Sequence, residues 1–213
     1  MSRKLFALLV LGLLLASPGF AQDDTEADAE AEPTKEYRLS WGIFAGQLTG
    51  DEISKQAYEG LVPELDDTTF AGALFAVRAG RSVWAEIRLG LSQTQFLNTP
   101  KGDMDVDLWF LDVAFVPQWQ WGRWGVGVPL GVGWASASTD DVLLERIPGR
   151  DRTLQLDDGD GGTYFAGVRG FVDASDRWTL SIDVRAKRFH RLINVTERNV
   201  KSTELSIAFS RKF

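Results

Sequence analysis

The sequence contains one histidine, His190, and no cysteine, so few side chains are available for acid–base or nucleophilic chemistry. A hydrolase built on a serine nucleophile needs its general base within hydrogen-bond reach of the hydroxyl. Ser202 and Glu204 would approach His190 if the segments that carry them formed neighbouring strands. An exposed histidine at the end of a strand is the simpler interpretation. We therefore expect no enzymatic activity and no catalytic residue.

Residues 157–162, Asp-Asp-Gly-Asp-Gly-Gly, bring three carboxylates close together. A calcium loop needs carboxylates at defined alternate positions and a distal glutamate, and this segment lacks that spacing and that glutamate. Aspartate and glycine are also ordinary turn residues. We expect no metal site and no cofactor.

A larger group of ionisable side chains lies at alternate positions among glycine and serine. In an extended chain, alternate side chains point to the same face. Their signs nearly balance, which favours ion pairs in an enclosed space. We interpret them as an interior charge network, made of Arg38, Glu86, Arg88, Asp112, Arg169, Asp183, Arg185, Lys187 and Glu204.

Apolar and small residues alternate through most of the chain from residue 37 onward, which predicts strands. The segment 124–135 is the clearest: Trp124, Val126 and Val128 alternate with glycines, and the pattern continues past Pro129. A helix would scatter these residues around its axis, and the glycines and proline would destabilise it. Eight strands are expected, at about 37–46, 69–79, 82–92, 106–116, 124–135, 163–173, 178–187 and 204–213.

Short and long connections alternate between these strands. Residues 80–81, 118–123 and 174–176 are expected turns, whereas 49–68, 95–104, 136–162 and 191–200 are longer polar loops. Turns at one end and loops at the other are typical of outer-membrane barrels whose termini lie in the periplasm. The predicted fold is all-β, an eight-stranded antiparallel up-and-down transmembrane β-barrel.

Alternation alone is also compatible with a soluble lipocalin-like barrel, a carrier with its apolar face inward. Small residues and balanced charges suit the narrow interior of an eight-stranded barrel, which favours the apolar face being outside. Aromatic residues at two heights predict the two membrane interfaces. These interface aromatics are Tyr37, Trp121, Trp124, Trp134, Tyr164, Trp178 and Phe213.

Two segments precede the predicted barrel. Residues 1–21 combine Arg3 and Lys4, a twelve-residue apolar run and a small-residue cleavage region, which predicts a cleaved signal peptide. Residues 22–36 hold seven acids and one lysine, and we expect an acidic, disordered periplasmic tail. That tail carries most of the net charge of −7. The barrel domain is therefore expected over residues 37–213, with no basic surface for nucleic acid.

The predicted strands, the turn and loop asymmetry and the terminal Phe213 resemble the small outer-membrane β-barrel families, namely the OmpA membrane domain, OmpX and OmpW. This resemblance implies a monomeric protein of the Gram-negative outer membrane, in contact with outer-membrane lipids and lipopolysaccharide. It also implies recognition of the C-terminal strand by the barrel assembly machinery. Lipid A-modifying enzymes have barrels of this size too, but the deacylase family has a serine two residues after its histidine, where this chain has Leu192.

Fold alone does not decide the function. We expect a barrel with a closed interior and surface loops, which has a structural or interaction role in the envelope. Alternatives are a small transport pore for ions or small solutes and, less favoured, a lipid A-modifying enzyme. Arginines in the third long loop could contact lipopolysaccharide phosphates through bidentate hydrogen bonds; they are Arg146, Arg150 and Arg152.

Overall fold

The computed structural model describes residues 38–50, 64–99, 102–139, 143–146, 153–156, 158–190, 192 and 200–213. The predicted signal peptide, the acidic tail and Tyr37 lie outside the described residues, as do Arg150 and Arg152. In this part of the chain, no helix is long and apolar enough to cross a membrane.

The described residues form twelve strands, all in antiparallel pairings. Their bounds are β1 Leu39–Leu48, β2 Glu64–Leu65, β3 Thr68–Gly80, β4 Val83–Leu97, β5 Met104–Trp121, β6 Trp124–Gly127, β7 Leu130–Ser138, β8 Leu143–Arg146, β9 Thr153–Leu156, β10 Gly159–Asp173, β11 Trp178–His190 and β12 Val200–Lys212.

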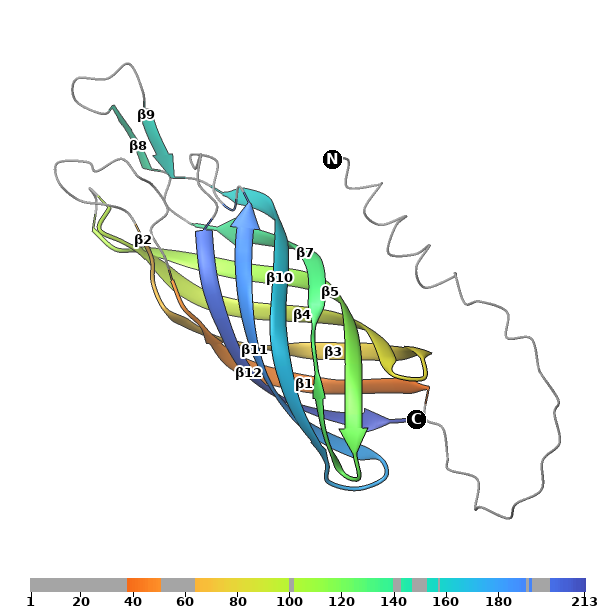
Figure 1. The fold of residues 1–213 in the computed structure, drawn as a ribbon. Helices are drawn as coiled ribbons and strands as arrows, with labels where there is room; N and C mark the ends of the chain where they lie inside the picture. Colours follow the sequence, from red (N-terminus) through yellow and green to blue (C-terminus); the bar gives the residue numbers. More distant parts are fainter. Residues whose placement is uncertain are drawn as a thin grey trace, which may run out of the picture. The chain divides into compact units, whose positions relative to one another are not determined.

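The main sheet closes on itself, because β1 pairs with β12 as well as with β3 (Figure 1). Going round the ring, β3 pairs with β4, β4 with β5, β10 with β11 and β11 with β12. Both β6 and β7 lie between β5 and β10, so together they occupy one position. Among the described strands the ring therefore has eight positions, which confirms the predicted eight-stranded antiparallel barrel.

The break between β6 and β7 falls at Val128 and Pro129. Proline has no N–H, so it cannot donate a backbone hydrogen bond to a neighbouring strand. The chain nevertheless stays in place: the Val128 N–H donates to the Pro117 carbonyl and the Gly167 N–H donates to the Pro129 carbonyl. The predicted fifth strand is thus one strand interrupted at its proline.

Several strands extend beyond their predicted ends. β4 continues to Leu97, and β5 runs from Met104 to Trp121, so the turn predicted at 118–123 shrinks to the residues between Trp121 and Trp124. Two predicted loops also contain strands. β2 pairs with the end of β4, and β8 pairs with β9 as a separate two-stranded sheet (Figure 1). These additions lie at the end of the barrel with the long connections, called here the loop end; the opposite end is the turn end.

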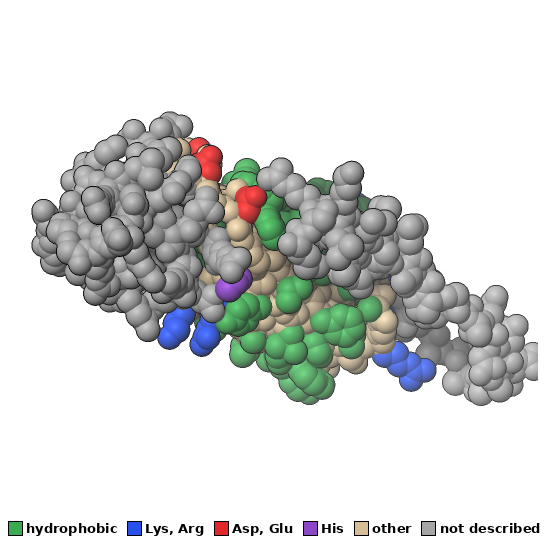
Figure 2. All heavy atoms as spheres, turned by 90° about the horizontal axis from the view of Figure 1, so that it is seen from above, with side chains coloured by type: hydrophobic (Ala, Val, Ile, Leu, Met, Phe, Trp, Pro, Cys, Tyr) green, Lys and Arg blue, Asp and Glu red, His purple; other side chains and the backbone are tan. Residues whose placement is uncertain are grey.

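Large apolar side chains are exposed on the outside of the barrel, and Figure 2 shows some of them on one face. Ile43 is 63% exposed, Leu91 62% and Val168 62%. Water would not stabilise so much exposed apolar surface, whereas lipid would. The lipocalin-like alternative is contradicted, because the apolar face points outward and buried charges lie inside.

Candidate functional site

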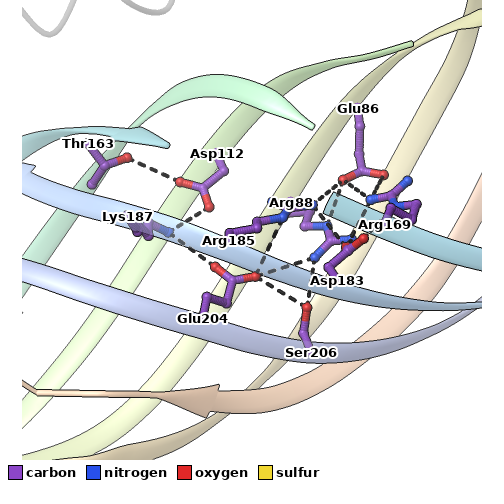
Figure 3. A network of polar contacts seen from close by, with 10 residues as sticks. All are labelled: Glu86, Arg88, Asp112, Thr163, Arg169, Asp183, Arg185, Lys187, Glu204 and Ser206. Carbon is purple, nitrogen blue, oxygen red and sulfur yellow. Dashed lines mark hydrogen bonds and ion pairs between the residues drawn. The ribbon is translucent and has the colours of Figure 1, made fainter. Parts of the chain in front are cut away.

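The charged side chains of the barrel interior form one connected network (Figure 3). The described part of the chain has eight buried ionisable residues, four of each sign: Glu86, Arg88, Asp112, Arg169, Asp183, Arg185, Lys187 and Glu204. They come from β4, β5, β10, β11 and β12, which surround the lumen. Because the signs cancel, the interior can hold these groups without excess charge.

Two carboxylates, Glu86 and Asp183, are shared by three arginines. Arg88 Nε donates to Glu86 Oε1 at 2.7 Å, and Arg185 Nη2 donates to the same oxygen at 2.9 Å. Arg169 Nε donates to Asp183 Oδ1 at 2.6 Å, and its Nη2 lies 2.8 Å from Glu86 Oε2. Arg88 and Arg185 both also donate to Asp183. Charge-assisted bonds of this kind are the strongest hydrogen bonds in proteins.

A second part of the network lies nearer the loop end. Lys187 Nζ donates to Asp112 Oδ2 at 2.6 Å, and Thr163 Oγ1 donates to Asp112 Oδ1 at 3.2 Å. Glu204 connects the two parts, because its carboxylate lies 3.8 Å from Lys187 Nζ and 3.5 Å from Arg88 Nη1. Lys187 Nζ also lies 3.8 Å from the centre of the Phe110 ring, a cation–π contact.

The hydrogen bonding is incomplete at one position. Arg185 Nε and Nη1 and Glu204 Oε2 are buried and make no hydrogen bond, although Arg185 Nε lies 3.8 Å from Glu204 Oε1. Unsatisfied buried polar atoms cost free energy. The contact between Arg185 and Glu204 is therefore the weakest part of the network.

Five inward phenylalanines each lie over a glycine directly opposite on a neighbouring strand. A Cβ on any of these glycines would run into the facing ring. Glycine is required here because it leaves the space that the ring fills. The pairs are Phe44–Gly72, Phe70–Gly46, Phe110–Gly90, Phe165–Gly131 and Phe171–Gly125.

The lumen is also filled with apolar side chains at the loop end. Most of these buried side chains come from strand ends that adjoin the long connections, and Leu192 lies just beyond such an end; they include Leu48, Leu65, Phe96, Met104, Phe189, Leu192 and Val200. The sequence analysis placed small residues and balanced charges on the inner face. The charged residues occupy the middle of the barrel, and at the loop end apolar residues share the inward positions with hydroxyl side chains such as Thr94 and Ser202.

The aromatic residues expected at the interfaces mostly face outward. Trp121 is 64% exposed, Trp124 68% and Phe213 48%, all at the turn end. Tyr164, 44% exposed, lies nearer the loop end, where Val132 and Arg188 are its cross-strand neighbours. Trp134 and Trp178 are half-buried. The outward rings lie at two heights, and their position at the membrane interfaces stays a prediction.

Solved structures share this architecture. The Neisserial surface protein A structure aligns with a TM-score of 0.52 at 15% identity, covering 82% of this chain and 97% of that chain. OprG from Pseudomonas aeruginosa aligns with a TM-score of 0.55 at 12% identity, covering 84% and 98%. AlkL, solved in lipid bilayers, gives 0.54 at 15%, covering 90% and 97%.

The fold is that of the small β-barrels of the Gram-negative outer membrane. No protein-family model matches the sequence, and no curated protein sequence matches it. At these identities the structural likeness shows the fold alone.

Within this outer-membrane fold, His190 cannot act on Ser202 or Glu204 in the arrangement considered from sequence. Ser202 and Glu204 are buried on the inner face, whereas His190 is exposed on the outer face. The reason is parity: Ser202 pairs with Lys187 and Glu204 with Arg185, both odd-numbered inward positions of β11, while His190 has an even number. The histidine–serine–acid hypothesis is therefore wrong.

Two further predicted groups have different outcomes. Arg38 is exposed and does not share the buried position of the other network residues, because β1 begins only at Leu39 and Arg38 lies at the open turn end. Arg146 is the last residue of β8, while Arg150 and Arg152 lie outside the described residues, so lipopolysaccharide contact by these arginines stays a prediction.

Proposed function

We propose that this chain is a protein of the Gram-negative outer membrane with a structural or interaction role, in which a closed barrel holds surface-exposed groups at the lipopolysaccharide layer. The outward apolar surface supports the membrane location. The filled interior supports a role that does not depend on passage through the lumen.

The observation that carries the proposal is the paired network across the lumen. Strands on different sides of the ring are joined by it: Arg88 of β4 contacts Asp183 of β11, and Lys187 of β11 contacts Asp112 of β5. An eight-stranded barrel has room inside only for side chains. Phenylalanines of the phenylalanine–glycine pairs pack against these ion pairs, as Phe44 does with Arg88 and Phe165 with Arg185, and apolar side chains are buried at the loop end.

Planar-bilayer recording tests the closed interior. Folded protein, identified by its faster gel migration before boiling than after, is inserted into a bilayer of neutral phospholipid. We expect no steady conductance above the empty bilayer. A reproducible channel whose conductance changes in the Lys187→Met variant, and not in the Arg177→Met variant, would favour the small transport pore, since Arg177 lies in an exposed turn.

Two outward cations favour contact with lipopolysaccharide at the loop end. Arg188 of β11 lies directly opposite Lys201 of β12, and Tyr164 lies on the other side of Arg188. Figure 2 shows basic side chains and the histidine beside apolar side chains of the barrel. The phosphates of lipid A are anions that arginine and lysine can bind, at the height where an interface tyrosine ends the apolar band.

The test is lipopolysaccharide binding by folded protein in detergent. The double variant Arg188→Gln, Lys201→Gln should bind lipopolysaccharide about tenfold more weakly, since it loses charge-assisted bonds to phosphate. The variant Arg146→Gln, Arg150→Gln, Arg152→Gln tests the loop arginines separately. Arg177→Gln at the turn end is the matched control. Unchanged binding in both multiple variants would contradict a lipopolysaccharide contact through these cations.

A further inference from the structure

Arg211 is a cation on the lipid-facing side of β12, at the turn end of the barrel. The outward side chains of this strand alternate as Leu205, Ile207 and Phe209, and Arg211 takes the next outward position. Its cross-strand neighbours are Trp41 of β1 on one side and Trp178 of β11 on the other. A row of tryptophan, arginine and tryptophan therefore crosses three strands.

Aromatic rings surround this guanidinium. Arg211 Cζ lies 4.9 Å from the centre of the Phe213 ring and 5.7 Å from that of Trp178. Phe213 is stacked on Trp41 with ring centres 6.4 Å apart, and Trp178 is stacked on Phe209 with centres 4.6 Å apart. Because these rings are stacked on one another, they form a rigid aromatic site that orients the guanidinium of Arg211.

The guanidinium has no anionic partner among the described residues, in contrast to the eight interior charges. Its Nε is enclosed by protein atoms and makes no hydrogen bond, while the terminal Nη atoms are not enclosed in this way. A cation at the edge of an apolar surface is stabilised by an anion that approaches from the membrane interface. The open guanidinium edge fits the planar, bidentate geometry of phosphate oxygens.

We propose that Arg211, with Trp41, Trp178 and Phe213, binds the phosphate of a glycerophospholipid in the periplasmic leaflet. The acyl chains of that lipid would lie along the apolar row of Phe209, Ile207 and Leu205 on the same face. The inference rests on the proposed membrane location. It is independent of lipopolysaccharide contact, which concerns the opposite end of the barrel.

Native mass spectrometry of the folded, detergent-solubilised chain tests this site. The protein is incubated with dioleoylphosphatidylglycerol or with a phosphate-free galactosyl diacylglycerol of the same acyl chains. We expect the wild type to retain phosphatidylglycerol in preference to the galactolipid. Arg211→Met should lower the bound fraction about tenfold, because charge-assisted hydrogen bonds to phosphate are lost. Arg177→Met, an exposed arginine of the same end, should leave it unchanged.

Gel migration without boiling shows first that each variant forms the barrel, and insertion into phosphatidylglycerol vesicles shows that it enters a membrane. Failure of the wild type to insert would contradict the membrane location itself. Given insertion, equal retention of phosphatidylglycerol by wild type and Arg211→Met would overturn the proposal, as would equal retention of both lipids by the wild type. Arg211→Gln repeats the comparison if Arg211→Met does not fold.

Discussion

Adjacent side chains of β11 meet opposite environments. Asp183 and Arg185 are 1% and 0% exposed inside the barrel, whereas Ile182 and Val184, next to them along the strand, are 50% and 48% exposed outside. A soluble barrel would show the reverse. The comparison shows how a lipid surrounding determines which residues each face of a strand carries. The outer face carries apolar groups, and the inner face carries charges only where charges of opposite sign balance them.

The two faces also differ in how their charges are stabilised. Inside, every arginine of the network faces at least one carboxylate, as Arg169 does with Glu86 and Asp183. Outside, Arg188 and Arg211 lie near the two ends of the barrel, within reach of the membrane interfaces. Charge on the inner face thus depends on protein partners, and charge on the outer face depends on height in the membrane.

Removing an inner anion should have the largest effect. Asp183→Asn leaves Arg88, Arg169 and Arg185 with one carboxylate fewer in a buried space, which should cost about 3–5 kcal/mol of unfolding free energy. Urea unfolding of the barrel in vesicles, followed by tryptophan fluorescence, measures it. Asp176→Asn makes the same chemical change in an exposed turn and should alter stability by less than ~0.5 kcal/mol.

The double variant Arg88→Met, Asp183→Asn sharpens this result. It removes one charge of each sign and returns the network to three cations and three anions. Its loss of stability should be smaller than the sum of the two single losses, since each single variant leaves an uncompensated charge. Strict additivity would show that the network does not act as a unit.

On the outer face, introducing a charge should cost somewhat less. Val184 lies in the middle of β11, so Val184→Arg should destabilise the barrel by about 2–4 kcal/mol in the same vesicles. Leu180→Arg, nearer the turn end of that strand, should cost about 1 kcal/mol or less because the side chain reaches the interface. Equal costs at both positions would contradict the depth inferred for β11.

Much of this inside–outside sorting could be predicted from the sequence, because a period of two fixes the relative facing of every residue in a strand. Asp183, Arg185 and Lys187 were assigned to one face for that reason, and the structure buries all three. Parity cannot tell where a strand stops. Arg38 has inward parity but precedes β1, and Gln118 continues a strand where the sequence analysis expected a turn.

Other features depend on which strands are neighbours and in what register, and alternation alone does not give that. Pairing Phe110 with Gly90 requires the register of β4 against β5. The signal was present as glycines and phenylalanines at inward positions, but matching one with the other needs the closed ring. Likewise, the register of β11 against β12 places His190 on the face opposite Ser202.

The smallest of the expected effects tests this phenylalanine–glycine packing. A Cβ on Gly90 would lie inside van der Waals contact with three ring atoms of Phe110. That ring cannot move away easily, because Phe110 is fully buried, packs edge-on against Phe70 at 5.5 Å and supports Lys187 at 3.8 Å. Gly90→Ala should therefore cost about 1–3 kcal/mol by overpacking.

The matched control is Gly170→Ala, on the exposed face of β10, where an added Cβ would meet nothing within 4 Å. It should change the unfolding free energy by less than ~0.5 kcal/mol. Both substitutions add the same methyl group to a strand glycine in a strongly twisted sheet, so their difference isolates the contact with the ring. If the two variants were equally stable, Phe110 could repack around the methyl group, and the interior would be looser than a closed, ion-paired lumen requires.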